Sequence, residues 1–110
     1  MVELTREEAV FVLRFNHGEN RFDADFVDAC NAALDEVENT EAPVALVTVG
    51  TGKFYSNGLD LAFMGGLPRS EVGAYLRSVL SLQARILTCP MTTVAAVNGH
   101  AFGAGQDTCL

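Results

Sequence analysis

The sequence is poor in cysteine and in basic residues. It has 3 cysteines, an odd number, and no two of them form a Cys-x-x-Cys pair, so neither a disulfide framework nor a zinc knuckle is indicated. A reducing compartment fits this pattern best. Only 7 Lys and Arg stand against 14 Asp and Glu, which gives a formal charge of −7. A field of this sign repels nucleic-acid phosphates and anionic lipid headgroups, so we expect neither as a partner.

Signals for membranes, export and metals are also missing. The longest apolar runs fall far short of the ~20 residues that a membrane helix needs, and the N-terminus lacks the apolar segment of a secretory signal. His17 and His100 have no partner at a spacing typical of metal ligands, so no metal is expected. We expect a chain that does not insert in a membrane and lies in the cytoplasm or, in a eukaryote, in the peroxisomal or mitochondrial matrix.

The composition and length of the chain predict one folded domain. The 110 residues are 49% hydrophobic and 19% charged, which is too apolar for a disordered tail, and the chain is too short for two domains. A chain of this size buries only about two thirds of its unfolded surface, so we expect a thin core unless more chain or a partner covers it.

The spacing of apolar residues predicts alternating strands and helices. Residues 9–15 read as a strand, and residues 25–39 carry a stripe of 3.6-residue period with Asp23 or Asp25 as N-cap. Residues 44–49 are an uninterrupted β-prone run, as expected of a strand buried on both faces of a largely parallel sheet. Strand, helix and strand in this order suggest a crossover unit, and therefore an α/β fold.

The second half continues the pattern. Residues 59–64 predict one short helical turn, residues 92–97 a third strand, and a short helix begins near residue 102 or 103. Ser70 is predicted to cap a longer helix that ends before Pro90. The broad face of this helix is predicted to pack in the core and comprises Val72, Tyr75, Leu76, Val79, Leu80, Gln83, Ile86 and Leu87.

Two glycine-rich loops, residues 50–58 and 98–105, each follow a predicted strand. Open α/β sheets bind their ligands at this edge, although neither loop is a P-loop or a dinucleotide fingerprint. As a pair, the loops place two sets of backbone N–H groups at the ends of neighbouring strands. Two such donors converging on one carbonyl oxygen would form an oxyanion hole. For either loop alone, a tight turn without chemistry stays open as the alternative.

The same loops carry a family resemblance. Residues 53–61 (KFYSNGLDL) and residues 90–105 (PMTTVAAVNGHAFGAG) resemble the two signatures of the crotonase superfamily, the enoyl-CoA hydratases and isomerases, in order and at about the family's spacing. The residues of the first segment are most similar to those of Δ3,Δ2-enoyl-CoA isomerases. The resemblance implies a crotonase-like ββα spiral that is incomplete, with residues 1–110 as the N-terminal part of an acyl-CoA-binding domain.

The resemblance also implies roles for single residues. The backbone amides of Leu59 and Ala104 would form the oxyanion hole, and Asp107 stands where hydratases carry the first of two glutamates. The place of the second glutamate lies beyond Leu110, so Asp107 is the only candidate acid or base. The residues expected to contact the substrate or its coenzyme A are Asn20, Arg21, Phe22, Ser56, Asn57, Gly58, Asp60, Leu61 and Gly103. For Asp60, a helix-capping role is favoured over that of a base.

The function that follows from the resemblance is isomerisation or hydration of enoyl-CoA thioesters in fatty-acid metabolism, in a homo-oligomer such as a trimer or hexamer. No metal or redox cofactor is implied, because backbone amides polarise the thioester and coenzyme A is part of the substrate. The absent second glutamate leaves turnover open. The alternative is a catalytically inactive, truncated fragment that acts as a binding or oligomerisation module.

Overall fold

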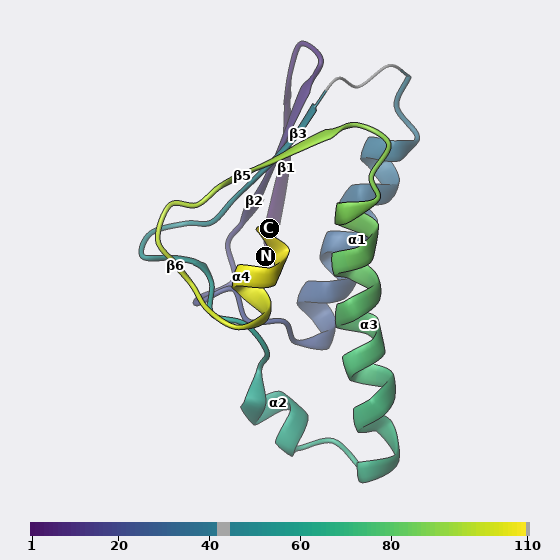
Figure 1. The fold of residues 1–110 in the computed structure, drawn as a ribbon, viewed down its shortest axis with the longest axis vertical. Helices are drawn as coiled ribbons and strands as arrows, with labels where there is room; N and C mark the ends of the chain where they lie inside the picture. Colours follow the sequence, from purple (N-terminus) through teal and green to yellow (C-terminus); the bar gives the residue numbers. More distant parts are fainter. Residues whose placement is uncertain (42–44, 110) are drawn as a thin grey trace.

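The computed structural model describes residues 1–41 and 45–109 (Figure 1). Along the chain its elements are β1 (Val2–Glu7), β2 (Val10–Phe15), α1 (Ala24–Glu38), β3 (Ala45–Val49), β4 (Phe54–Ser56), α2 (Leu61–Gly65), α3 (Arg69–Leu87), β5 (Thr92–Ala96), β6 (His100–Ala101) and α4 (Ala104–Thr108). The predicted α/β class is confirmed.

The main sheet has four strands in the order β1-β2-β3-β5. β2, β3 and β5 run parallel, and β1 pairs with β2 in the antiparallel sense, so the sheet is largely parallel as predicted. β1 has no clear signal in the sequence, since its stretch is acidic, four of its six residues are polar and exposed, and the other two are only partly buried. Among the described residues, no helix is long and apolar enough to cross a membrane.

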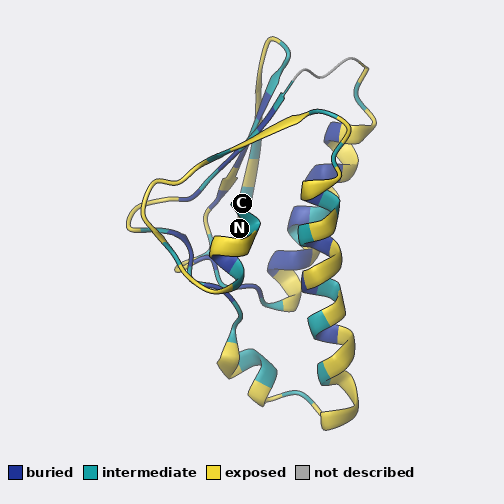
Figure 2. Cartoon of the chain, viewed as in Figure 1, coloured by how far each residue is buried: buried dark blue, intermediate teal, exposed yellow. Residues whose placement is uncertain are grey.

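Helices α1 and α3 lie side by side along one face of the sheet (Figure 1). Buried residues of β2 and β3 belong to the same apolar core as the stripe of α1. The ring of Phe26 packs edge to face against the rings of Phe15 and Phe22. Figure 2 shows this buried layer between sheet and helices, whereas β5 is mostly exposed. The thin core expected from the chain length is therefore one-sided.

The cap of α1 was predictable. Asp23, one of the two candidates, is the N-cap, and its Oδ1 accepts a hydrogen bond from the Phe26 backbone N–H at 2.8 Å. Its other oxygen lies 2.7 Å from His17 Nε2. The stripe that predicted the helix is buried at Phe26, Val27, Cys30, Ala33, Leu34 and Val37.

Three expectations are wrong. β3 is not buried on both faces: Leu46 and Thr48 are buried while the alternate residues are half-exposed, because no layer of the described chain covers the second face; Val44 lies outside the described residues. Ser70 does not cap α3, which starts one residue earlier behind Pro68 and has no side-chain cap. Leu80 and Leu87 are 62% and 75% exposed, because only the narrower stripe of Tyr75, Val79, Leu82 and Ile86 faces the core.

Candidate functional site

The two glycine-rich loops meet in a small second sheet. β4 and β6 pair in parallel, with Phe54 opposite His100. The His100 N–H donates to Lys53 O at 2.8 Å, and the Phe102 N–H donates to Ser56 O at 3.1 Å. The sequence predicted only loops here, and this pairing is what brings the two signatures together.

Glycines make the close approach of the loops physically possible. A Cβ built on Gly99 would lie 2.1 Å from Lys53 O, and one on Gly105 would lie 2.1 Å from Ser56 O, both far inside contact distance. Gly58 has φ +84°, and a Cβ there would lie 2.8 Å from Phe102 O and 3.3 Å from Ala104 N. Gly58 of the first loop therefore touches the start of α4 in the second loop.

The amides of Leu59 and Ala104 are both available. Ala104 is the first residue of α4, where backbone N–H groups have no partner within the helix. Among the described residues, neither the Leu59 N–H nor the Ala104 N–H donates a hydrogen bond. Leu59 is joined to the fold through its neighbours instead, by a parallel bridge with Phe22.

Three of the residues expected to contact coenzyme A have enclosed side chains. Asn20, Phe22 and Ser56 are at most 1% exposed. The Asn20 amide donates to Tyr55 O at 3.0 Å, and Ser56 Oγ donates to Asn20 O at 2.7 Å. The side chains of Asn20 and Ser56 therefore join the segment around residue 20 to β4.

The other expected contacts lie nearer the surface. Leu61 is 63% exposed, and Arg21 forms an ion pair with Glu19 at 3.3 Å. Asn57, Asp60 and Gly103 are exposed or half-buried, whereas Gly58 is buried under the second loop. Asp60 is the N-cap of α2, where Oδ1 accepts from the Phe63 N–H at 2.9 Å, so its predicted capping role is confirmed.

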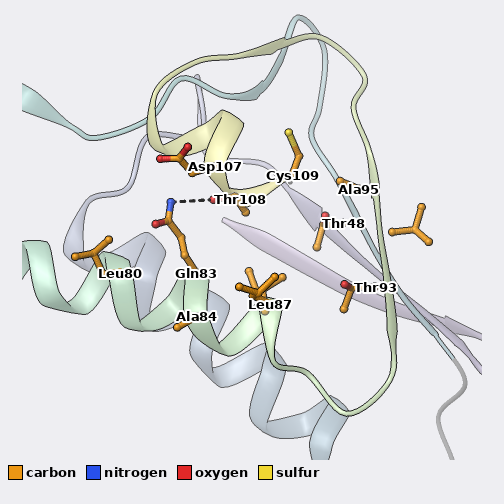
Figure 3. A pocket seen from close by; sticks show the side chains of 12 residues that line it. Thr48, Leu80, Gln83, Ala84, Leu87, Thr93, Ala95, Asp107, Thr108 and Cys109 are labelled. Carbon is orange, nitrogen blue, oxygen red and sulfur yellow. Dashed lines mark hydrogen bonds between the residues drawn. The ribbon is translucent and has the colours of Figure 1, made fainter.

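Asp107 lines a cavity of about 350 Å³ bounded by α3, α4, β3 and β5 (Figure 3). Its exposed carboxylate is one helical turn beyond Ala104, a spacing that places both on one face of α4. Gln83 spans from α3 to α4, donating to Ala104 O at 2.9 Å and Thr108 Oγ1 at 3.3 Å. Of the residues described as lining the cavity, none is Leu59 or Ala104. The cavity and the paired loops are thus neighbouring but separate features.

The apolar spacing predicts only a packing role for Tyr75, but its hydroxyl makes two hydrogen bonds in the structure. It donates to Phe22 O and accepts from the Asp60 N–H at 3.3 Å, beside Leu59. A tyrosine on the apolar stripe of a helix gives no sign of such a role, because the partners are backbone groups from distant segments.

Two other buried groups stay protonated at neutral pH. Burial raises the pKa of Tyr55 and of the Cys30 thiol to about 12.

Comparison with known proteins gives a consistent picture. A family model described as "Enoyl-CoA hydratase/isomerase" matches residues 5–110. The chain is 34% identical over 110 residues to "Enoyl-CoA delta isomerase 1, peroxisomal" of Arabidopsis thaliana, a match that covers 96% of this chain and 45% of the relative. It therefore spans less than half the length of that relative.

Solved structures of enoyl-CoA hydratases and isomerases also match this chain. A structure of an enoyl-CoA isomerase of Mycobacterium tuberculosis matches 94% of this chain and 45% of its own, at 30% identity and a TM-score of 0.85. An enoyl-CoA hydratase from Bacillus anthracis superposes with a TM-score of 0.90 over 97% of this chain and 43% of its own. Its sequence is only 18% identical, so this match supports the fold alone. The expectation of a crotonase-like fold, covered in its N-terminal portion, is confirmed.

Proposed function

The chain belongs to the enoyl-CoA hydratase/isomerase family, and on that premise we propose that it binds acyl-CoA thioesters with the Leu59 and Ala104 backbone N–H groups on the thioester oxygen. The observation that carries the proposal is the approach of the two loops, with Ala104 N 3.3 Å from a Cβ built on Gly58. Both amides are unused by the described residues, and a backbone hydrogen bond lies near each: the Phe22 N–H donates to Gly58 O, and the Phe102 N–H donates to Ser56 O.

Two fixed amides favour charge on the oxygen between them. When a base removes a proton beside the thioester, electrons move to the carbonyl oxygen, and preorganised donors stabilise the resulting enolate more than the neutral substrate. In the proposed reaction Asp107 is the proton acceptor at the α or γ carbon. Arg21, Asn57 and Leu61, whose side chains reach the surface of the first loop region, are the proposed contacts for the coenzyme.

A comparison of two ligands tests the binding site directly. Butyryl-CoA and the thioether S-butyl-CoA differ in the carbonyl oxygen, which is the group that the two amides would hold. With each hydrogen bond worth about 1 kcal/mol, we expect the thioester to bind roughly tenfold or more tightly in calorimetry. Equal affinities would refute an oxyanion site, and binding of neither ligand would refute acyl-CoA as the substrate class.

Asp107→Asn tests the proposed base. We expect the exchange of substrate α or γ protons with solvent deuterium, followed by nuclear magnetic resonance, to fall by about 10²–10⁴. Affinity for butyryl-CoA should change by less than about twofold, because the amide side chain has nearly the same size. Asp28→Asn, an exposed carboxylate on α1, is the matched control and should exchange at the original rate.

The outcomes of this exchange experiment separate the two functions. Exchange that survives in Asp107→Asn would show that Asp107 is not the base. If the unmodified chain binds the thioester more tightly than the thioether but exchanges no proton, the chain is an inactive binding module and not an enzyme. No feature of residues 1–41 or 45–109 favours that alternative beforehand.

A further inference from the structure

Within residues 1–41 and 45–109 the Leu59 N–H donates no hydrogen bond, so its direction depends on its neighbours. On one side of the chain, the Phe22 N–H donates to Gly58 O at 2.9 Å, as part of the parallel bridge between Phe22 and Leu59. In an extended chain, the C=O of one residue and the N–H two residues later point to the same side. Gly58 O and Asp60 N–H therefore share a side, and the Leu59 N–H points to the opposite one.

The Asp60 N–H, the second half of this arrangement, is held by a side chain from α3. Tyr75 Oη accepts from it at 3.3 Å and donates to Phe22 O, so the hydroxyl sits between the two backbone segments. Tyr75 is only 6% exposed, and its ring packs on Phe63 with centroids 5.3 Å apart. Helix α3 therefore places the hydroxyl between Phe22 O and the Asp60 N–H.

A buried pair holds the preceding peptide group. Ser56 Oγ donates to Asn20 O at 2.7 Å and accepts from the Gly58 N–H at 3.3 Å. Asn20 has φ +55°, and its side chain is bonded to the His17 N–H at 2.8 Å as well as to Tyr55 O. The groups around Leu59 are consequently engaged at Gly58 N, Gly58 O and Asp60 N, while the Leu59 N–H is left over.

We propose that Tyr75 is a positioning residue for the oxyanion site: its hydroxyl fixes the Leu59–Asp60 peptide so that the Leu59 N–H is aimed at the thioester oxygen. The inference rests on the proposed function. Tyr75 acts only through the backbone and does not touch the substrate. Burial raises the pKa of Tyr75, so the hydroxyl keeps its proton and can donate to Phe22 O at neutral pH.

Tyr75→Phe tests the proposal, because it removes one oxygen and keeps the buried ring. The readout is the infrared carbonyl stretch of crotonyl-CoA labelled with carbon-13 at the thioester carbon, which moves to lower frequency when the oxygen accepts hydrogen bonds. We expect the unmodified chain to shift this band and Tyr75→Phe to lose at least half of the shift. The affinity for S-butyl-CoA, which has no carbonyl, should stay within about twofold.

Tyr55→Phe is the matched control. Tyr55 is also buried, and its hydroxyl is 2.8 Å from Thr48 Oγ1 in the main sheet rather than beside Leu59. It also loses one buried hydrogen bond, worth about 1 kcal/mol in stability, yet it should keep the full band shift. A general loss of rigidity would affect both variants alike.

The infrared results distinguish the positioning role of Tyr75 from the proposed function itself. A full band shift in folded Tyr75→Phe overturns the positioning role while leaving the proposed function intact, and no shift in the unmodified chain refutes the proposed function itself. If Tyr75→Phe does not fold, 3-fluorotyrosine at position 75 replaces it, since it keeps the hydroxyl but alters its donor strength. The band must then move for position 75 and stay for position 55, and an unmoved band at 75 overturns the inference.

Discussion

Ala104→Pro is expected to lower proton exchange on the thioester by at least about 10²–10³ while the fold is kept, because it removes one oxyanion donor and puts a ring carbon where the hydrogen pointed. Ala104 is the first residue of α4, the position at which proline is best tolerated in a helix. Its N–H bonds to no described residue, so the folded state loses no hydrogen bond. Gly103 has ψ −124°, outside the helical region that a following proline forbids.

The matched control is Arg69→Pro, at the first position of α3. Arg69 is exposed and follows Pro68, whose ψ of 141° already suits a following proline. This variant should keep exchange, thioester preference and melting temperature. The assignment of Ala104 is contradicted if Ala104→Pro keeps its circular dichroism spectrum and melting temperature and still exchanges protons at the original rate.

Elements defined by local patterns were predictable from the sequence. The stripe of α1 and its cap at Asp23 depend on residues within a few positions of each other, and so does the short α2 with Asp60 at its start. The glycine-rich loops also stood out, because glycine occurs where two backbones touch, as Gly99 and Gly105 do here. The resemblance then linked the loops to a chemistry.

Long-range features were not predictable in the same way. β4 and β6 have three and two residues, too few for a periodic pattern, and their pairing joins positions more than forty residues apart. Leu80 and Leu87 carry the apolar spacing of the core face, yet their exposure depends on which elements cover α3. The hydroxyl contacts of Tyr75 are with backbone atoms of Phe22 and Asp60, which no side-chain pattern reports.

Gly105→Ala should be strongly destabilising, whereas Gly73→Ala should stabilise the chain, although both glycines lie in helices. At Gly105 the new Cβ would lie 2.1 Å from Ser56 O and 2.8 Å from Ser56 C, backbone atoms that the pairing of β4 with β6 holds in place. We expect a loss of about 3 kcal/mol in the free energy of unfolding, the upper range for overpacking. At Gly73 the nearest atom is the mobile tip of Arg77 at 3.5 Å, so alanine gains about 0.5–1 kcal/mol of helix propensity.

Thermal and urea unfolding measure both effects on the same scale. A loss of about 3 kcal/mol corresponds to a drop of more than ~10 °C in melting temperature for a domain of this size, and Gly73→Ala should raise it by a few degrees. If Gly105→Ala folds at all, its α4 must move away from Ser56, which separates Ala104 from Gly58. Such a variant should therefore also lose the preference for butyryl-CoA over S-butyl-CoA. Equal stabilities for the two alanine variants would mean that the second loop does not press on the first as closely as these contacts require.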